Sequence, residues 1–165
     1  SVRKFIRGKP VERNKLETLL KAAMAAPSAC NIQPWDFIII EDEESVRALQ
    51  DGIEQYAKYD PTVIIVICGN NEIIPWKDYG VVDCACAMEN IMIAAQSFGL
   101  GSCYVGFGAI IKGNPEVVKA LELQDDEAIF GPILLGYPKV NPTEAVSKAL
   151  ETIGPMKKEA TTKWI

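Results

Sequence analysis

The alternation of hydrophobic and polar positions predicts alternating helices and strands along the first third of the chain. Leucines and alanines recur at helical spacing between residues 11 and 26, and Pro27 ends this pattern. The segment from about Trp35 to Glu41 is predicted to be a strand. The acidic residues 42–44 suit the first turn of a helix that continues to about Tyr56.

The two most apolar segments are predicted to lie at the centre of the fold. The sequence TVIIVICGN, residues 62–70, is almost continuously apolar and β-branched, which is typical of a strand covered on both faces. From about Tyr79 to Phe98 the helical pattern is apolar on almost every side, which predicts a buried, central helix. Because this helix has little polar face, we expect self-association, and a dimer is the simplest closed assembly.

The next part of the chain is predicted to add two strands with a helix between them. Gly99 or Gly101 ends the long helix, and a short strand begins there. Residues 115–121 form a short helix that starts with a proline. Residues 128–138 supply a last strand, which is expected to be interrupted at Gly131-Pro132.

These elements predict one domain that spans residues 1–165. The chain is 48% hydrophobic and long enough to bury a core. The alternation of helices and strands indicates a two-layer or three-layer fold of the α/β or α+β class. From about residue 138 to residue 165 the pattern is polar and weakly periodic, so this part is expected to form an extended arm that lies on another surface.

Composition and charge exclude several kinds of partner. A net charge of −5 without a concentrated basic patch argues against nucleic acid. The longest apolar run, Val63–Cys68, is too short for a membrane helix, so no membrane partner is expected. The chain opens with SVRKF and shows no secretory signal, which makes the cytoplasm the expected location. The five cysteines show no disulfide framework and are expected to be reduced.

The absence of histidine limits the candidate chemistry. It excludes Ser-His-Asp and Cys-His catalytic arrangements and most zinc sites, so we predict no metal site. Cys84 and Cys86 lie two residues apart in the helical pattern and point to different sides, which favours core packing. Cys30 lies in a loop without a nearby base and is given a minor role at most.

The stretch APSACNIQPWDF, residues 26–37, has two interpretations. Its prolines, serine and asparagine can form an ordinary turn in which the side chains bond the local backbone. Alternatively, Ser28, Asn31 and Gln33 form a binding edge, held by the flanking prolines against an apolar wall that contains Trp35.

Basic residues gather near both ends of the chain. Such clusters are usually solvated, but both ends could converge on one anion, such as the phosphate of a cofactor. The residues are Arg3, Lys4, Arg7 and Lys9 near the start, and Lys157, Lys158 and Lys163 near the end.

Four segments, taken in order, resemble the FMN-dependent nitroreductase family. They are SVRKF at residues 1–5, AAPSACNIQPWDF at 25–37, ENIMIAAQSFGLGSCYVG at 89–106 and GPILLGYP at 131–138. The resemblance implies an α+β fold of three layers, with a central, mostly antiparallel sheet flanked by helices. It also implies a homodimer in which the C-terminal arms are exchanged and FMN lies at the subunit interface.

The resemblance further implies which residues bind the flavin. Ser1 and Arg3 would contact its ribityl-phosphate arm or pyrimidine edge. Pro27, Ser28, Asn31 and Gln33 would approach it from the partner chain. Tyr104, Val105 and Gly106 would run along the isoalloxazine, with a backbone amide near flavin N5, and Lys157 or Lys158 would meet the phosphate.

The function implied is that of an NAD(P)H oxidoreductase in which FMN carries the chemistry. Hydride would pass from NAD(P)H through FMN to a small-molecule acceptor, a nitroaromatic or a quinone, in ping-pong order. Two alternatives stay open. One is another branch of the same flavin family, with flavin destruction, dehalogenation or reduction of an activated alkene as its task, and the other is a non-catalytic FMN-binding dimer.

Overall fold

The computed structural model describes residues 1–51, 59–70, 79–106, 114–123 and 127–140. The following elements lie within these residues, in chain order: α1 (Arg13–Met24), the 3-10 helix η1 (Ala29–Asn31), β1 (Trp35–Ile40), α2 (Glu43–Asp51), β2 (Val63–Asn70), α3 (Tyr79–Ser97), β3 (Gly101–Tyr104), α5 (Pro115–Ala120) and β4 (Glu127–Gly136). The distal part of the helix predicted to reach Tyr56 and most of the predicted C-terminal arm lie outside the described residues.

The strands form a four-stranded sheet in the order β1-β2-β4-β3, and each neighbouring pair is antiparallel. Side chains of β2 alternate between the two faces of this sheet because successive residues of a strand point in opposite directions. Ile65 and Ile67 belong to the core on one face, and Ile64 and Val66 belong to the core on the other. The prediction that this strand is covered on both faces is confirmed.

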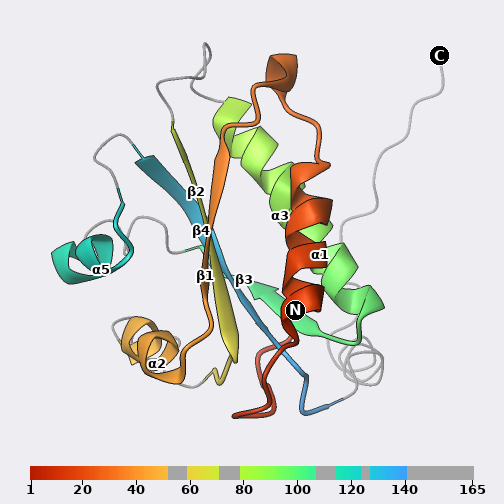
Figure 1. Ribbon diagram of the computed structural model, residues 1–165, viewed down its shortest axis with the longest axis vertical. Helices are drawn as coiled ribbons and strands as arrows, with labels where there is room; N and C mark the ends of the chain where they lie inside the picture. Colours follow the sequence, from red (N-terminus) through yellow and green to blue (C-terminus); the bar gives the residue numbers. More distant parts are fainter. Residues whose placement is uncertain (52–58, 71–78, 107–113, 124–126, 141–165) are drawn as a thin grey trace, which may run out of the picture.

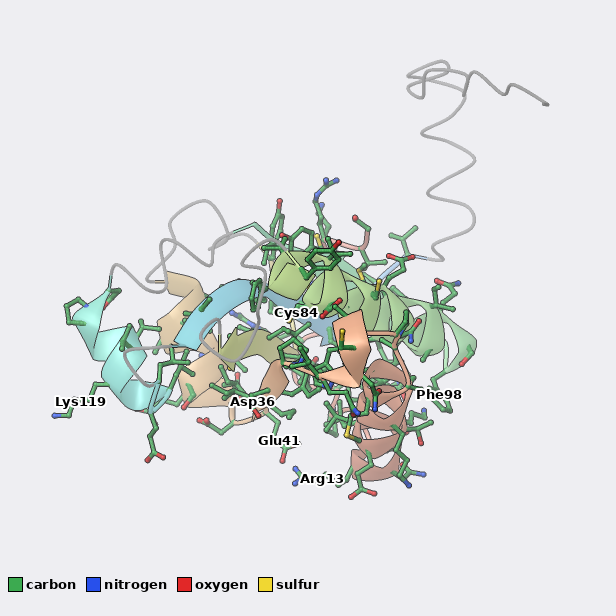
Figure 2. All side chains as sticks on the ribbon, turned by 90° about the horizontal axis from the view of Figure 1, so that it is seen from above. Arg13, Asp36, Glu41, Cys84, Phe98 and Lys119 are labelled. Carbon is green, nitrogen blue, oxygen red and sulfur yellow. The ribbon has the colours of Figure 1, made fainter. Side chains whose placement is uncertain are left out.

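Helices cover the sheet on both sides, which gives three layers (Figure 1). α1 and α3 pack on one face through residues such as Leu19 and Ile91, whereas α2 and α5 lie on the other with Val46, Leu49 and Val117. In Figure 2, Lys119 of α5 and Phe98, which follows α3, lie on opposite sides of the molecule. The predicted α+β architecture with a flanked, antiparallel sheet is therefore confirmed.

The predicted interruption of the last strand at Gly131-Pro132 is wrong. β4 continues through both residues, and its register against β2 shifts between Ile67 and Cys68. Gly131 has a φ of 148°, a value that glycine adopts more readily than other residues. A local bulge therefore accommodates the residues that were expected to break the strand.

The prediction that the long helix is buried on almost every side is also wrong for the single chain. One side of α3 packs against α1 and the sheet. On the other side, the side chains of Val82 and Ile93 are 57% and 61% exposed. We refer to Val82, Ala85 and Ile93, which lie along this exposed side, as the outer face of α3.

A network around Tyr137 connects the beginning of α1 to the residue that follows β4. The Tyr137 hydroxyl donates to Glu12 Oε2 at 2.7 Å, and Lys15 Nζ donates to the same hydroxyl at 2.6 Å. Lys9 Nζ lies 3.8 Å from the centroid of the Tyr137 ring. The hydroxyl is the main reason that the pKa of Glu12 is lowered from 4.5 to about 2.

We expect Tyr137→Phe to lower the free energy of unfolding at neutral pH and to reduce its dependence on acid pH. A lowered carboxyl pKa stabilises the fold above the unfolded-state pKa, and this contribution disappears as the pH falls through the folded-state pKa. The difference between the parent and Tyr137→Phe should therefore narrow between pH 4.5 and about 2. Phenylalanine retains the ring beneath Lys9. Urea unfolding at several pH values checks this, and parallel stability curves would contradict it.

Candidate functional site

The loop between α1 and β1 forms a tight turn with an unusual backbone. Cys30, Asn31 and Gln33 have φ values of 51°, 57° and 53°. Asparagine tolerates this left-handed region, but it is less favourable for most other residues with a Cβ. We refer to residues 28–33 as the strained turn. A conformation of this kind persists only where surrounding contacts hold it.

The polar side chains of the strained turn bond to one another. The Gln33 backbone N–H donates to Ser28 Oγ at 3.0 Å, and Gln33 Nε2 donates to Asn31 Oδ1 at 3.1 Å. Asn31, Gln33 and the preceding Pro27 are exposed, and Ser28 is half-buried. The turn interpretation is thus correct for the local bonds, but the exposed amide groups still face outward and are available to a ligand.

A residue that the sequence analysis did not single out anchors this turn to α3. Both carboxylate oxygens of Asp83 accept the Ala29 backbone N–H, at 3.2 Å for Oδ1 and 3.1 Å for Oδ2. Asp83 is only 4% exposed. A single aspartate on the buried side of an apolar helix was the signal that could have identified it, because a buried carboxylate requires hydrogen-bond donors.

The exit of the turn lies against β2 without space for a side chain. A Cβ on Gly69 would lie 2.2 Å from the Pro34 carbonyl oxygen. Trp35, the next residue, is 7% exposed and belongs to the core between the sheet and α1 and α3. The tryptophan therefore supports the turn from within the core.

A second group of predicted site residues lies along β3. The Val2 N–H donates to the Ser102 carbonyl at 2.8 Å, which places Ser1 and Arg3 beside this strand. The first residue of β3, Gly101, lies so close that a Cβ there would meet the Val2 side chain at 2.8 Å. Ser1 and Arg3 are both exposed.

Two basic neighbours of Arg3 already interact with side chains of the chain. Arg7 forms an ion pair with Asp60 at 3.6 Å, and Lys9 lies over the ring of Tyr137. Within the part of the chain that the structure describes, the Arg3 guanidinium forms no ion pair. Its charge is therefore available to an anion.

Tyr104, Val105 and Gly106 continue from the end of β3. The Val105 N–H donates to the Pro132 carbonyl at 3.0 Å. The Tyr104 ring lies over Gly131, where a Cβ would come within 2.6 Å of the ring. Gly106 is exposed, and its N–H makes no backbone hydrogen bond to the described residues. Gly106 thus offers the available amide of this segment.

The two groups do not meet within one chain. The strained turn lies next to β1 and the end of β2, whereas Ser1, Arg3 and Tyr104–Gly106 lie along β3, at the opposite edge of the sheet. Two to three strand spacings separate them, which is roughly 10–14 Å. A single chain therefore holds the predicted site residues in two separate groups, the strained turn and the residues along β3, here called the β3 group; we refer to the two groups as half-sites.

The other candidate residues are two lysines near the end of the chain and the cysteines. Lys157 and Lys158 lie outside the described residues. Cys84 is fully buried, and burial is the main reason that its pKa is raised to about 12, which makes it an inert core thiol. Cys30 is exposed in the strained turn. The expected core role of Cys84 is confirmed.

Comparisons with known proteins show which proteins this chain resembles. A protein-family model described as the nitroreductase family matches residues 1–67 and 51–137. A protein of Archaeoglobus fulgidus, provisionally named an NADH dehydrogenase/NAD(P)H nitroreductase, is 35% identical over 131 residues, which cover 75% of this chain and 72% of that protein.

Solved structures show the same fold. A protein of Clostridium acetobutylicum, provisionally named an NADH oxidase, has a TM-score of 0.75 at 34% identity and covers 84% of each chain. The NADPH:FMN oxidoreductase of Vibrio harveyi, solved with NAD+, has a TM-score of 0.71 at 25% identity. That match covers 86% of this chain and 66% of the Vibrio chain. Among the helices that the structure describes, none is long and apolar enough to cross a membrane.

Proposed function

The chain belongs to the nitroreductase family, and from this premise we propose that it is an FMN-dependent NAD(P)H oxidoreductase that acts as a homodimer. The flavin and nicotinamide assignment is supported by the Vibrio harveyi relative, which is named an NADPH:FMN oxidoreductase and was solved with NAD+. Residues 1–165 would form a single FMN-binding domain, in which residues from about 138 onward are the arm. The cytoplasm is its proposed location.

The observation that carries the homodimer is the separation of the two half-sites. The strained turn and the β3 group lie at opposite edges of one sheet, and a second copy of the chain would bring a turn next to each β3 group. In a two-fold symmetric dimer, each turn would complete the site that the partner's β3 group begins. Two equivalent FMN sites at the subunit interface would result.

The surface of the single chain supports this assembly. The outer face of α3 exposes Val82 and Ile93, and burial of such a face is a common basis for dimers. The outer edge of β3 is already occupied, because the Ser102 carbonyl accepts the Val2 N–H. In contrast, no described segment pairs with the outer edge of β1. An exchanged C-terminal arm would cover that unpaired edge.

The residues present fit FMN, which is anionic and has a polar ring edge. Arg3, with Ser1 beside it, would hold the phosphate arm or the pyrimidine edge, and Lys157 or Lys158 would add charge at the phosphate. The Gly106 N–H would be the donor to the ring, because the Val105 N–H already bonds the Pro132 carbonyl. The partner's turn would contribute its Asn31 and Gln33 amide groups.

These residues would bind and orient FMN, and none of them is required to transfer a proton. The chemistry that FMN supplies when bound is acceptance of a hydride from NAD(P)H and its delivery to a nitroaromatic or quinone acceptor, in ping-pong order. A histidine-free chain is compatible with this division of roles. The exposed positions of Tyr104 and Gly106 leave room for a nicotinamide and an acceptor to use one surface in turn.

Spectroscopy on the purified full chain tests the proposal. The protein is expected to bind one FMN per chain, to lose flavin absorbance anaerobically with NADH or NADPH, and to regain it when a nitroaromatic or quinone is added. Bound flavin that neither nucleotide bleaches would favour the non-catalytic dimer. Bleaching without reoxidation by these acceptors would favour another branch of the family, with dehalogenation, alkene reduction or flavin destruction as its reaction.

We expect Arg3→Ala to weaken FMN binding by about tenfold to a hundredfold, because a charge-assisted contact contributes about 1.5–3 kcal/mol. Lys4→Ala is the matched control, since it removes the same charge one residue away at another exposed position. Titration of the flavin-free protein with FMN measures both dissociation constants. Equal affinities for Arg3→Ala and Lys4→Ala would contradict the assignment of Arg3.

A further inference from the structure

We propose that Asp83 is the positioning residue of the flavin site, which holds the strained turn in its binding conformation before the cofactor arrives. The inference builds on the proposed function, because it takes the turn to be part of the FMN site. The effect of the buried Asp83 carboxylate on the conformation of the turn does not depend on bound FMN.

The hydrogen bonds between Asp83 and Ala29 anchor the strained turn to α3. The two residues are 54 positions apart, and the Ala29 N–H points between both carboxylate oxygens. The carboxylate is buried, so hydrogen bonding to a backbone N–H offsets part of its desolvation. Hydrogen bonds to charged acceptors are also stronger than those between neutral groups.

The position of this anchor determines the course of the turn. Ala29 immediately precedes the left-handed pair Cys30 and Asn31. At the other end, the Pro34 carbonyl rests on Gly69, where no side chain intervenes. A segment fixed at both ends has few alternative conformations, so its strained backbone can persist.

This arrangement lowers the conformational entropy that FMN binding must otherwise remove. Asn31 and Gln33 are exposed, and the one side-chain contact between them does not fix their position relative to the rest of the protein. The anchor at Ala29 and the support at Gly69 supply that fixed position. Rigidifying a binding loop in its bound conformation increases affinity mainly by reducing the loss of entropy on binding.

Asn90 provides a matched control on the same helix. Its Nδ2 donates to the Ala22 carbonyl at 3.0 Å, so it also connects α3 to the segment that contains α1 and the turn. Asn90→Ala removes a polar contact of α3 but leaves the Asp83 anchor intact. Asp83→Asn retains an oxygen that can accept the Ala29 N–H but removes the charge.

The test combines hydrogen exchange with FMN titration on the full chain. In Asp83→Ala, amide exchange in the peptide that covers residues 28–33 is expected to accelerate roughly tenfold to a hundredfold, and FMN binding should weaken by a similar factor. Asp83→Asn should restore most of both properties. Asn90→Ala should leave exchange in residues 28–33 and the FMN dissociation constant close to those of the parent.

Three results would overturn the proposal. The first is unchanged exchange in residues 28–33 of Asp83→Ala, and the second is an equal acceleration in Asn90→Ala, which would indicate general loosening. The third is faster exchange in residues 28–33 of Asp83→Ala with an unchanged FMN dissociation constant, which would mean that Asp83 holds the turn without positioning it for the flavin. If Asp83→Ala does not fold, Asp83→Ser, which also removes the carboxylate, takes its place in both measurements, and unchanged exchange in residues 28–33 then overturns the proposal. A parent chain that binds no FMN would refute the proposed function, while the exchange measurements would still decide the role of Asp83.

Discussion

Gly69→Ala is expected to destabilise the folded chain by about 3 kcal/mol, at the upper end of the usual range for overpacking. A Cβ at this position would lie 2.2 Å from the Pro34 carbonyl oxygen and 3.2 Å from the Phe130 ring. The first contact is with backbone, which cannot rotate away as a side chain can. Either the pairing of β1 with β2 must open at Trp35, or the exit of the strained turn must move.

Gly106→Ala is the control for stability, measured without added FMN. A Cβ on Gly106 has nothing within 4 Å, so this variant should unfold at nearly the same urea concentration as the parent. Gly69→Ala should unfold at a lower concentration and show faster exchange in residues 28–33. A Gly69→Ala protein as stable as Gly106→Ala would mean that the close contact at Pro34 does not exist in solution.

Ile93→Lys is expected to convert the dimer into a monomer that does not retain FMN. Ile93 is 61% exposed in the single chain and belongs to the outer face of α3, which the proposed dimer buries. A lysine here replaces apolar contact surface with an ammonium group, whose desolvation in an interface is unfavourable, and two-fold symmetry introduces it twice. We expect the dimer dissociation constant to rise by at least about a hundredfold, or about 2.7 kcal/mol.

Loss of the dimer should remove FMN binding, because neither half-site is complete alone. Ala48→Lys is the matched control, since it places the same side chain at an exposed position of α2, on the other side of the sheet. Sedimentation and FMN content should be measured on the same samples. A monomeric Ile93→Lys protein with parental FMN affinity would contradict a shared site, and a dimeric one would place the interface elsewhere.

The local pattern of the sequence was sufficient to predict the elements and their approximate ends. The long helix was predicted from Tyr79 to Phe98 and spans Tyr79–Ser97, with Gly99 in the left-handed region just beyond it. The β-branched run of β2 was recognised as a central strand for the same reason. Period and residue type act over a few neighbouring positions, so a single sequence contains this information. The motifs also identified the nitroreductase family.

Properties that depend on distant partners were decided by the tertiary structure. Asp83 accepts the N–H of Ala29, 54 positions away, and Arg7 is paired with Asp60, 53 positions away. Gly131-Pro132 remained inside β4 because a register shift against β2 accommodates it.

The composition of α3 showed that the helix is apolar, but only its packing against α1 and the sheet decided which side faces outward. In the same way, the candidate site residues were chosen from motifs along the chain, whereas their separation into two groups followed from the strand order β1-β2-β4-β3. Strand order and helix orientation arise from contacts between residues far apart in sequence, and local periodicity carries no information about such contacts.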